Sequence, residues 1–275
     1  MLGAASDASR LDAATDAFTP DARDTGRTID VGNDAFTPSD AGRDAFTPSD
    51  AGRDMGVDSG MPGETACTGA LASAVICDGF ETDPGPWAGL NVHFGTVAAD
   101  SLQAQRGTHA LHAQITTFSG HAARYIDTLG PFTTGDIWIR GSLFIPSSAV
   151  VNDFTWFSIV ENMPPYHGIS LGMGSDLAVG SYSTISSTYT SDSALTLPRD
   201  TWTCLELHIQ LSATAGSVEI NRGGVLGASS TGINTIPAAG FAQFSVGIDY
   251  SSAAQGATEV WIDEVALSRS RLPCP

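Results

Sequence analysis

The stretch EVWIDEVALS (259–268) decides the fold of this chain. Read with the two-residue period of a β-strand, it is mostly apolar on both faces. We therefore expect a strand that is covered on two sides, as is the strand that closes a β-sandwich. The alternation places Trp261, Val265 and Leu267 on one face and Val260, Ile262 and Ala266 on the other.

Asp263 interrupts the apolar pattern of this strand. A bare buried carboxylate is too costly, so Asp263 must accept hydrogen bonds from backbone N–H groups or bind a cation. A matching signal is CDGFE (77–81), in which Glu81 directly follows the apolar Phe80. We predict that these two segments lie side by side and enclose one globular β-domain.

The composition favours strands and turns, and it excludes some partners. The 275 residues include 30 Gly and 14 Pro, and only 15% are charged, which suits short strands and many turns. The net charge is −18, and all 12 basic residues are arginines, so we expect no binding to nucleic acid or to an anionic membrane surface. The sequence has no run of 18 apolar residues, so no membrane insertion is expected.

From residue 66 onward the sequence reads as short β-segments separated by turn clusters such as Ser119-Gly120. With about a dozen such segments and no convincing helix, we predict an all-β fold for residues 66–275, a two-sheet antiparallel β-sandwich of the jelly-roll type. The expected strands are 92–97, 110–116, 121–128, 136–145, 154–161, 169–174, 177–183, 201–211, 216–222, 241–249 and 259–268.

Residues 1–65 form a separate region that contains a repeat. DAFTPSDAGR occurs at 34–43 and again at 44–53, and the related DAFTPDARDTGR occurs at 16–27. Each unit has one bulky apolar residue, a phenylalanine, which is too little to offset the entropy of ordering the chain. We predict a disordered linker rich in Asp, Thr and Pro that acts as a spacer. Calcium binding by the aspartates and O-linked sugars on the threonines are the alternatives to a bare linker.

The chain has four cysteines without zinc-like spacing, so we expect disulfides and a location outside the cytoplasm, either secreted or at the cell surface. The preferred pairing joins Cys77 to Cys274, because the first strand and an antiparallel last strand would be neighbours, and leaves Cys67 with Cys204. The sequence-local pair of Cys67 and Cys77 stays open. The start, MLGAASDASR (1–10), shows no export signal, and we give the cysteines more weight.

Four segments carry a resemblance to a known family. They are FETDPGPW (80–87), RGTHALHAQI (106–115), TWTCLELHI (201–209) and VWIDEVALS (260–268). Together they resemble the frame of the concanavalin A-like lectin/glucanase jelly rolls, a superfamily that includes LamG-like domains and carbohydrate-binding modules of similar build. The resemblance covers roughly residues 77–270 and is architectural, and the fold hosts lectins, adhesion modules, glycoside hydrolases and polysaccharide lyases alike.

The resemblance implies a structural calcium ion that joins the first and last strands. Its ligands here would be Glu81 and Asp263, with a backbone carbonyl near Gly107, and such oxygen ligands suit calcium. The alternative is that Asp263 only accepts backbone hydrogen bonds.

The catalytic patterns of this superfamily match poorly, and no catalytic residue is predicted. Retaining glycosidases place acids on alternate residues of one strand, as in E-x-D-x-E, and Glu259, Asp263 and Glu264 do not have that spacing. The R-x-E-L and Q-(I/V)-H strings of alginate-lyase-like relatives are absent. A looser set that could supply the chemistry of such a lyase is Arg140, Tyr166, His167 and His208.

Candidate sugar contacts occur on strands and in loops. Trp138 and Arg140 oppose the apolar row of their strand, and Trp156 lies in a strand that ends at Glu161. Both indoles would stack on sugar if they line the concave sheet, and the alternative is that they are ordinary core. The other candidates are Tyr166 and His167 in a loop after two prolines, Tyr182, which with Tyr189 flanks a Ser/Thr-rich stretch expected to be a rim loop, and His208.

We predict a carbohydrate-binding, lectin-like module without catalysis. The alternatives are a polysaccharide lyase or glycoside hydrolase that uses the concave face of the same sandwich, and a structural surface protein that binds a protein partner. Residues after Glu64 include 17 of the 30 acids and 7 of the 12 arginines, so a neutral glycan is expected rather than a polyanionic one. The module is expected to be a monomer.

Overall fold

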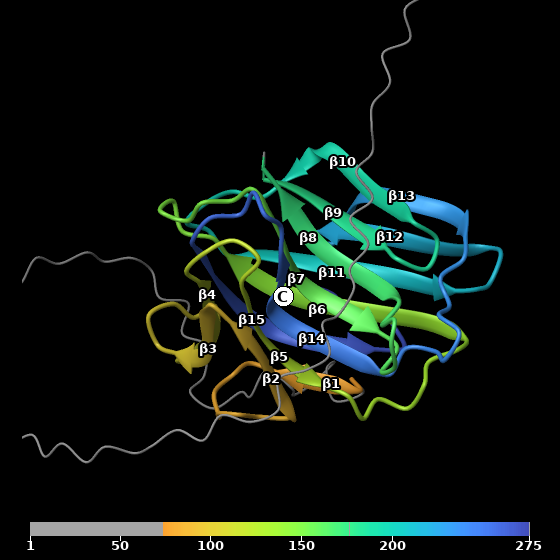
Figure 1. Ribbon diagram of the computed structural model, residues 1–275, viewed down its shortest axis with the longest axis horizontal. Coiled ribbons are helices and arrows are strands. Elements are labelled where there is room, and N and C mark those ends of the chain that lie inside the picture. The colour runs from red at the N-terminus through yellow and green to blue at the C-terminus, as the bar shows by residue number, and fades with distance from the viewer. Residues whose placement is uncertain (1–73, 176, 275) are drawn as a thin grey trace, which may run out of the picture. The chain divides into compact units, whose positions relative to one another are not determined.

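Fifteen strands and no helix occur in the described residues, 74–175 and 177–274, of the computed structural model (Figure 1). They form two antiparallel sheets, which confirms the predicted all-β sandwich. No part of this described chain forms a helix suited to crossing a membrane. The strands are β1 (Ile76–Asp78), β2 (Gly89–His93), β3 (Gly95–Asp100), β4 (Ala110–Ile115), β5 (His121–Ile126), β6 (Gly135–Phe144), β7 (Asp153–Val160), β8 (Gly168–Gly174), β9 (Ala178–Ser183), β10 (Thr188–Thr196), β11 (Thr203–Leu211), β12 (Gly216–Arg222), β13 (Val225–Ile233), β14 (Gln243–Ser251) and β15 (Thr258–Ser268).

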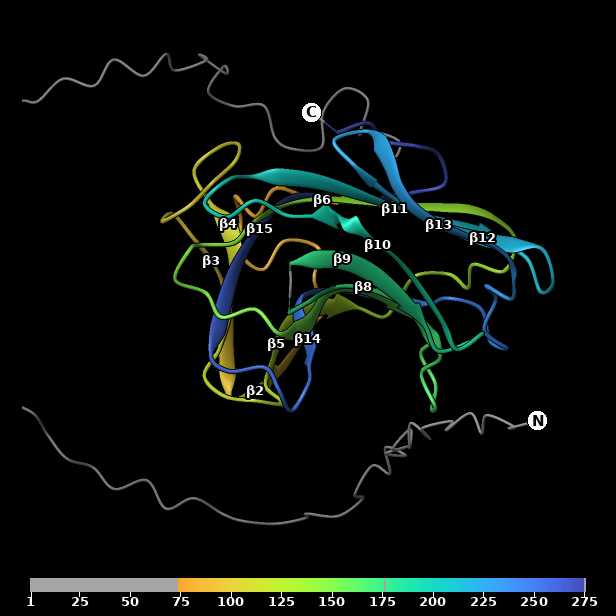
Figure 2. The same cartoon turned by 90° about the horizontal axis from the view of Figure 1, so that it is seen from above.

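The chain passes repeatedly from one sheet to the other, as in a jelly roll. Sheet A has the order β13-β12-β11-β6-β15-β4-β3, with β1 also paired to β15, and sheet B has the order β10-β9-β8-β7-β14-β5-β2. Figure 2 shows the two layers from above, with sheet A at the top of the view and sheet B below it. The predicted linker, 1–65, and the predicted domain boundary at residue 66 lie outside the described residues.

The hydrophobic core lies between the sheets and is built from alternate residues of their strands. In β11, Leu205, Leu207 and Ile209 are at most 1% exposed, as their predicted alternation requires. Phe157 of β7 and Phe244 of β14 belong to the same buried cluster, with ring centroids 6.2 Å apart. Since burying one such side chain contributes about 1.5–3 kcal/mol, this interior is the main source of stability.

β15 departs from the predicted alternation at its middle. A β-bulge lies between Asp263 and Ala266 in the pairing with β6, and Glu264 there has a φ of 55°. The extra residue reverses the alternation beyond the bulge, so the grouping of Trp261 with the last apolar residues of the strand is wrong. The core-facing residues are Val260 and Ile262 before the bulge and Val265 and Leu267 after it.

β1 pairs with β15, which confirms the predicted proximity of the two segments. Cys77 lies opposite Ala266, and the chain then buries Phe80, whose ring stacks on Trp87 at 6.2 Å. Asp78 fixes this corner, because its carboxylate accepts hydrogen bonds from the Phe80 N–H (2.8 Å) and from Trp87 Nε1 (2.7 Å). Burial raises the pKa of Asp78, although both hydrogen bonds act in the opposite direction.

Some strands were not expected from the sequence. β10 replaces the predicted rim loop, and β13 has no predicted counterpart. The expected strand 92–97 is two strands, because the backbone turns at Phe94 (φ 52°) and the chain leaves sheet B for sheet A. Ser- and Thr-rich segments such as β10 lack the apolar alternation that reveals a strand.

A disulfide joins Cys204 to Cys274. The preferred pairing of Cys77 with Cys274 is therefore wrong, and so is that of Cys67 with Cys204. The reason is that the chain continues past β15 as a C-terminal segment, 269–274, which crosses the outer face of β6 and β11 instead of ending beside β1. Cys77 is also disulfide-bonded, and the open alternative pairs it with Cys67, which lies outside the described residues.

Candidate functional site

The outer face of sheet B carries a continuous cross-strand row of tyrosines and serines. Ile169 and Leu171 of β8, like Phe157 and Ile159 of β7, fill the core, so the residues between them point outward. The strand pairing places each member of the row opposite the next. From β10 to β2, this Tyr–Ser row is Tyr189, Tyr182, Ser170, Ser158, Ser245, Tyr125 and Gly89.

Two rings of the Tyr–Ser row lie over glycines of neighbouring strands. A Cβ on Gly180 would lie 2.2 Å from Oη of Tyr189, and a Cβ on Gly89 would lie 2.2 Å from Cζ of Tyr125. Only glycine leaves room for a ring at these two places. The rings can therefore lie along the sheet, which is the orientation in which an aromatic face stacks on a sugar ring.

The Tyr–Ser row combines exposed rings with a floor of small side chains. Tyr189 and Tyr182 are 58% and 45% exposed, whereas Ser158 and Ser245 are 3% and 4% exposed. The hydroxyls of Ser158 and Ser170 are hydrogen-bonded at 3.0 Å. Sheet B curves in Figure 2 so that β8 and β9 arch toward sheet A, and the row lies on the concave side.

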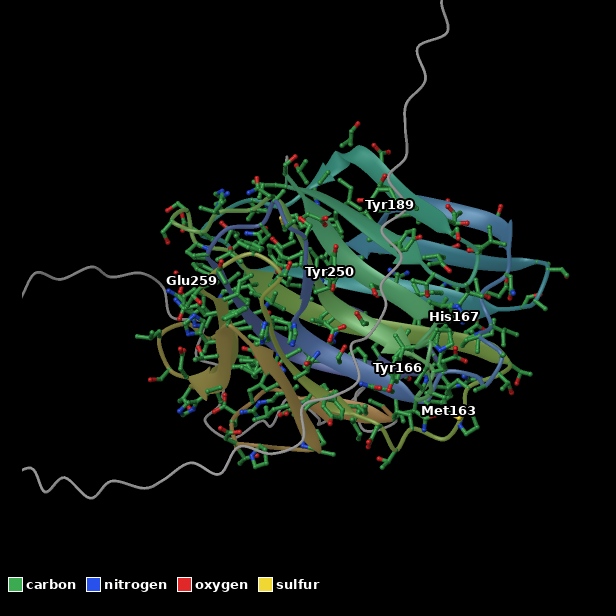
Figure 3. The ribbon with its side chains drawn as sticks, viewed as in Figure 1. Met163, Tyr166, His167, Tyr189, Tyr250 and Glu259 are labelled. Carbon is green, nitrogen blue, oxygen red and sulfur yellow. A yellow bond between two sulfur atoms is a disulfide. The ribbon has the colours of Figure 1, made fainter. Side chains whose placement is uncertain are left out.

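Tyr250 of β14 adds a further ring to this concave face. It lies opposite Thr155 of β7, is 54% exposed, and appears with Tyr189 over the front sheet in Figure 3. Burial, and then the charge of Asp153, raises the pKa of Tyr250, so its hydroxyl stays a neutral donor and acceptor at pH 7.

The concave face has no permanent positive charge among the described residues. Its basic groups are His93 and His121, whose rings stack at 5.4 Å, and burial, followed by the effect of His93, lowers the pKa of His121. The arginines of the described chain bind other groups of the protein, away from this face. Arg106, Arg124, Arg140 and Arg271 pair with carboxylates, and Arg199, Arg222 and Arg269 donate to backbone carbonyls.

Three predicted sugar contacts lie between β7 and β8, at the edge of this face. Glu161 is 4% exposed and holds His167, with Oε1 3.1 Å from Nδ1 and 3.2 Å from the backbone nitrogen, while its Oε2 accepts from the Ala239 N–H at 3.2 Å. Tyr166 is 53% exposed, and Figure 3 shows it with His167 at the right-hand ends of the front strands. Glu161 is thus a positioning residue, and the other two are available at the rim.

Trp138 and His208 lie on the outer face of sheet A instead. They face each other in the pairing of β6 with β11, and their rings stack at 3.9 Å. His208 Nε2 lies 2.9 Å from Asp136 Oδ1, and Nδ1 lies 3.0 Å from Glu219 Oε2. Both ring nitrogens of His208 are therefore already engaged within the protein, and the ring of Trp138 is stacked on it.

Arg140 and Trp156 do not fit their predicted role. Arg140 is 4% exposed, lies 3.2 Å from Glu264 Oε2 and donates to the Pro273 carbonyl at 2.7 Å. Trp156 is 0% exposed and packs edge-on against Phe154. Neither side chain offers a surface to a sugar in this structure, and for Trp156 the alternative reading as core agrees with its burial.

The looser lyase set is not brought together. Arg140 and His208 belong to sheet A, whereas Tyr166 and His167 belong to the turn between two strands of sheet B. The alternation of a strand indicates which side chains point outward, but it does not indicate which of the two sheets carries them.

Glu81 binds the loop that follows β3. Its carboxylate accepts hydrogen bonds from the Thr108 N–H (2.9 Å), the Thr108 hydroxyl (2.8 Å) and the His109 N–H (3.1 Å). Gly107 leaves no room for a side chain beside these oxygens, because a Cβ there would lie 2.2 Å from Glu81 Oε1. These hydrogen bonds give the acidic residue directly after Phe80 a structural role.

Asp263 binds the same loop from β15. Its Oδ2 accepts the N–H groups of Gln105 (2.9 Å) and Arg106 (3.0 Å), and its Oδ1 accepts that of Glu264 (2.7 Å). Burial raises the pKa of Asp263 to about 6 against these three hydrogen bonds. The expected alternative to a metal, hydrogen bonding by the backbone, is thus present.

Calcium at Glu81 and Asp263 stays a prediction. Both carboxylates face N–H donors of one loop, and such donors compete with a cation for the same oxygens. No group of three or more His, Cys, Asp or Glu side chains among the described residues could hold a metal ion.

The two curved antiparallel sheets define a sandwich of the jelly-roll type, which is the fold that the sequence resemblance predicted. One solved structure similar to this chain is the endo-beta-1,4-glucuronan lyase from the fungus Trichoderma reesei, with a TM-score of 0.58 and 15% identity over 72% of this chain and 96% of the lyase. Another is the cellulose induced protein Cip1, with a TM-score of 0.53 and 18% identity over 73% of this chain and 100% of Cip1. No protein-family model and no curated protein matches the sequence. At these identities the likeness shows the fold alone.

Proposed function

We propose that the chain is a carbohydrate-binding module that holds a neutral glycan on the concave face of sheet B without cleaving it. The observation that carries this proposal is the Tyr–Ser row. Exposed rings at Tyr189 and Tyr182 would stack on the apolar faces of sugar rings. The small side chains of Ser158 and Ser170 lie between these two rings and Tyr125 at the other end of the row. They leave space for the glycan between the tyrosines.

The charge of this face supports a neutral ligand. A polyuronate needs cations along its binding surface, and no described arginine lies there, while burial keeps His121 more often neutral. The net charge of −18 would also repel a polyanion at long range. A neutral glycan needs only rings, hydroxyls and amides.

The alternatives are an enzyme on the same face and a structural protein with a protein partner. A lyase would need a cation together with a His–Tyr pair, and the predicted residues for this chemistry lie on different sheets. A protein partner would be favoured if no glycan bound. Binding without catalysis is therefore the function that we propose.

The test is a glycan array probed with the full chain, followed by calorimetry with the best neutral glycan. Tyr189→Ala should weaken binding about tenfold, because one stacked ring is lost. Phe118→Ala is the matched control, since Phe118 is 59% exposed and lies outside the row. Equal affinity of the Tyr189 variant and the wild type would reject the site. Release of unsaturated or reducing sugar ends would favour the enzyme.

Two further expectations belong to this proposal. Disulfide bonding at Cys204 and Cys274 supports a secreted or cell-surface protein. We propose that it acts as a monomer and that calcium, if bound at Glu81 and Asp263, stabilises the first and last strands. Repeating the glycan titration with calcium and with EDTA separates a structural ion from one that the glycan needs.

A further inference from the structure

A hollow of about 650 Å³ lies where strand ends of sheet A meet the end of β10, and no residue of the Tyr–Ser row lines it. Trp202 and Thr203 at the start of β11 form one wall, and Arg222 at the end of β12 forms another. Gln105, Cys274 and the segment 196–198 also line it, and the disulfide of Cys274 ties the C-terminal segment to β11. In Figure 2 this segment runs outside sheet A, opposite the concave face of sheet B.

The hollow offers an aromatic surface at Trp202. This indole is half-buried and is supported by Phe144, with ring centroids 5.6 Å apart. A supported, partly exposed indole is suited to stack on the apolar face of a sugar ring. The amide of Gln105 and the hydroxyl of Thr203 add groups that can donate to and accept from sugar hydroxyls.

The hollow also contains a guanidinium that no carboxylate neutralises. Arg222 is exposed and donates to the Thr196 carbonyl, and no ion pair in the described part of the chain includes it. The acid on the neighbouring strand, Glu206, is held instead by Arg271 through two hydrogen bonds of 3.0 and 2.9 Å. In a chain of net charge −18, such a guanidinium beside an indole is a local site for a carboxylate.

We propose that the Trp202–Arg222 hollow is a second saccharide site, which takes a single sugar ring that bears a carboxylate. The carboxylate pairs with Arg222, and the ring stacks on Trp202. The volume is within the range of small-ligand sites, about 300–1,000 Å³. This site differs in position and in ligand charge from the neutral-glycan site proposed for the concave face, so either can fail without the other.

The experiment is a titration of the full chain with glucuronic acid, monitored by NMR or calorimetry. Glucose serves as the uncharged comparison sugar. Glucuronate should bind more tightly than glucose, and Arg222→Gln should weaken it about tenfold through loss of a charged hydrogen bond. Trp202→Ala should weaken both sugars. Arg269→Gln is the matched control, because Arg269 is exposed, also donates to a backbone carbonyl, and lies outside the hollow.

Two outcomes would overturn this inference. One is equal binding of glucuronate by the wild type and the Arg222 variant at unchanged thermal stability. The other is loss of glucuronate binding in Tyr189→Ala, which would move the ligand to the concave face. If Trp202→Ala unfolds the protein, Trp202→Phe keeps an aromatic surface, and the Arg222 variant decides alone because that side chain is exposed.

Discussion

Gly180 has no side chain, and the ring of Tyr189 occupies the space that one would take. In the proposed glycan site, the glycine would thus act on binding through a tyrosine of the next strand. The atom that an added Cβ would meet is the far end of a flexible side chain, so the ring would move while the sheet stays intact. Residues that never touch a ligand can in this way fix the orientation of one that does.

We therefore predict that Gly180→Ala weakens binding of the neutral glycan by roughly threefold to tenfold, because the ring no longer lies along the sheet. The free energy of unfolding should change by less than about 1 kcal/mol. Calorimetry and urea unfolding measure the two effects. Gly130→Ala is the control, since a Cβ there meets nothing within 4 Å. Equal losses in both variants would contradict the prediction.

Asp263 makes the stability depend on pH. Its pKa of about 6 in the fold lies above the ordinary value of 3.8, so the folded state binds the proton more tightly than the unfolded chain. The sign follows directly: this contribution is fully present below about pH 4 and is lost as the pH rises through about 6. The raised pKa values of Asp78 and Glu264, also caused by burial, act in the same direction.

We predict that the free energy of unfolding, measured with urea in the presence of EDTA, falls by up to about 3 kcal/mol from Asp263 between pH 4 and pH 7. Asp263→Asn should be less stable overall, because its amide cannot accept from all three N–H groups. The free energy of unfolding of this variant should also fall less between pH 4 and pH 7 than that of the wild type. An unchanged slope in the variant would assign the pH dependence to other groups.

At the scale of elements, the C-terminal segment 269–274 closes the outer face of sheet A. Arg271 lies over the ring of Trp138 at 5.5 Å, and the disulfide from Cys274 fixes the end of the segment to β11. Because the cross-link joins residues 70 positions apart, it restricts the unfolded chain strongly.

Replacement of Cys204 and Cys274 by alanine should lower the free energy of unfolding by about 2–5 kcal/mol. Neutral-glycan binding on the concave face should persist, because the Tyr–Ser row belongs to sheet B. Binding of glucuronate should weaken, because Cys274 lines the Trp202–Arg222 hollow. Urea unfolding and calorimetry check these effects, and loss of neutral-glycan binding in a folded variant would contradict the separation of the two faces.

The sequence predicted the architecture well because most strands alternate regularly, as β11 does. It failed where the backbone adds a residue. The bulge in β15 reverses the alternation after Asp263. In β7, a register shift lies between Thr155 and Phe157, and Trp156, which was a candidate sugar contact, is buried there. A bulge leaves no mark in the pattern of residue types.

The candidate site was predicted only in part. Tyr182 and the rim residues Tyr166 and His167 were identified as exposed contacts, and they are exposed or at the rim. The serines of the Tyr–Ser row could not be predicted as contacts, because a serine in a strand is ordinary and only the pairing of β8, β7 and β14 aligns these three. Tyr189 was expected with Tyr182 beside a rim loop, whereas it lies on β10, opposite Tyr182 of β9.

For the whole molecule, the charge of the ligand determines how its affinity depends on salt. If the concave face takes a neutral glycan, its affinity should change by less than about twofold between about 20 mM and about 300 mM NaCl, because screening acts only on charged pairs. Calorimetry at the two salt concentrations measures this. Glucuronate at the Trp202–Arg222 hollow should bind more weakly at the higher concentration. A steep salt dependence for the neutral glycan would contradict our view of that face.

β1 opens the described chain and the C-terminal segment ends it, and both are attached to sheet A. Both described ends are therefore attached to the sheet that does not carry the Tyr–Ser row. If the row binds glycan as proposed, a face without either of these attachments suits a broad, immobile target such as a polysaccharide fibre. The placement of β1 beside β15 thus keeps this described part of the chain off the Tyr–Ser row, as the proposed binding to a target much larger than the protein itself would require.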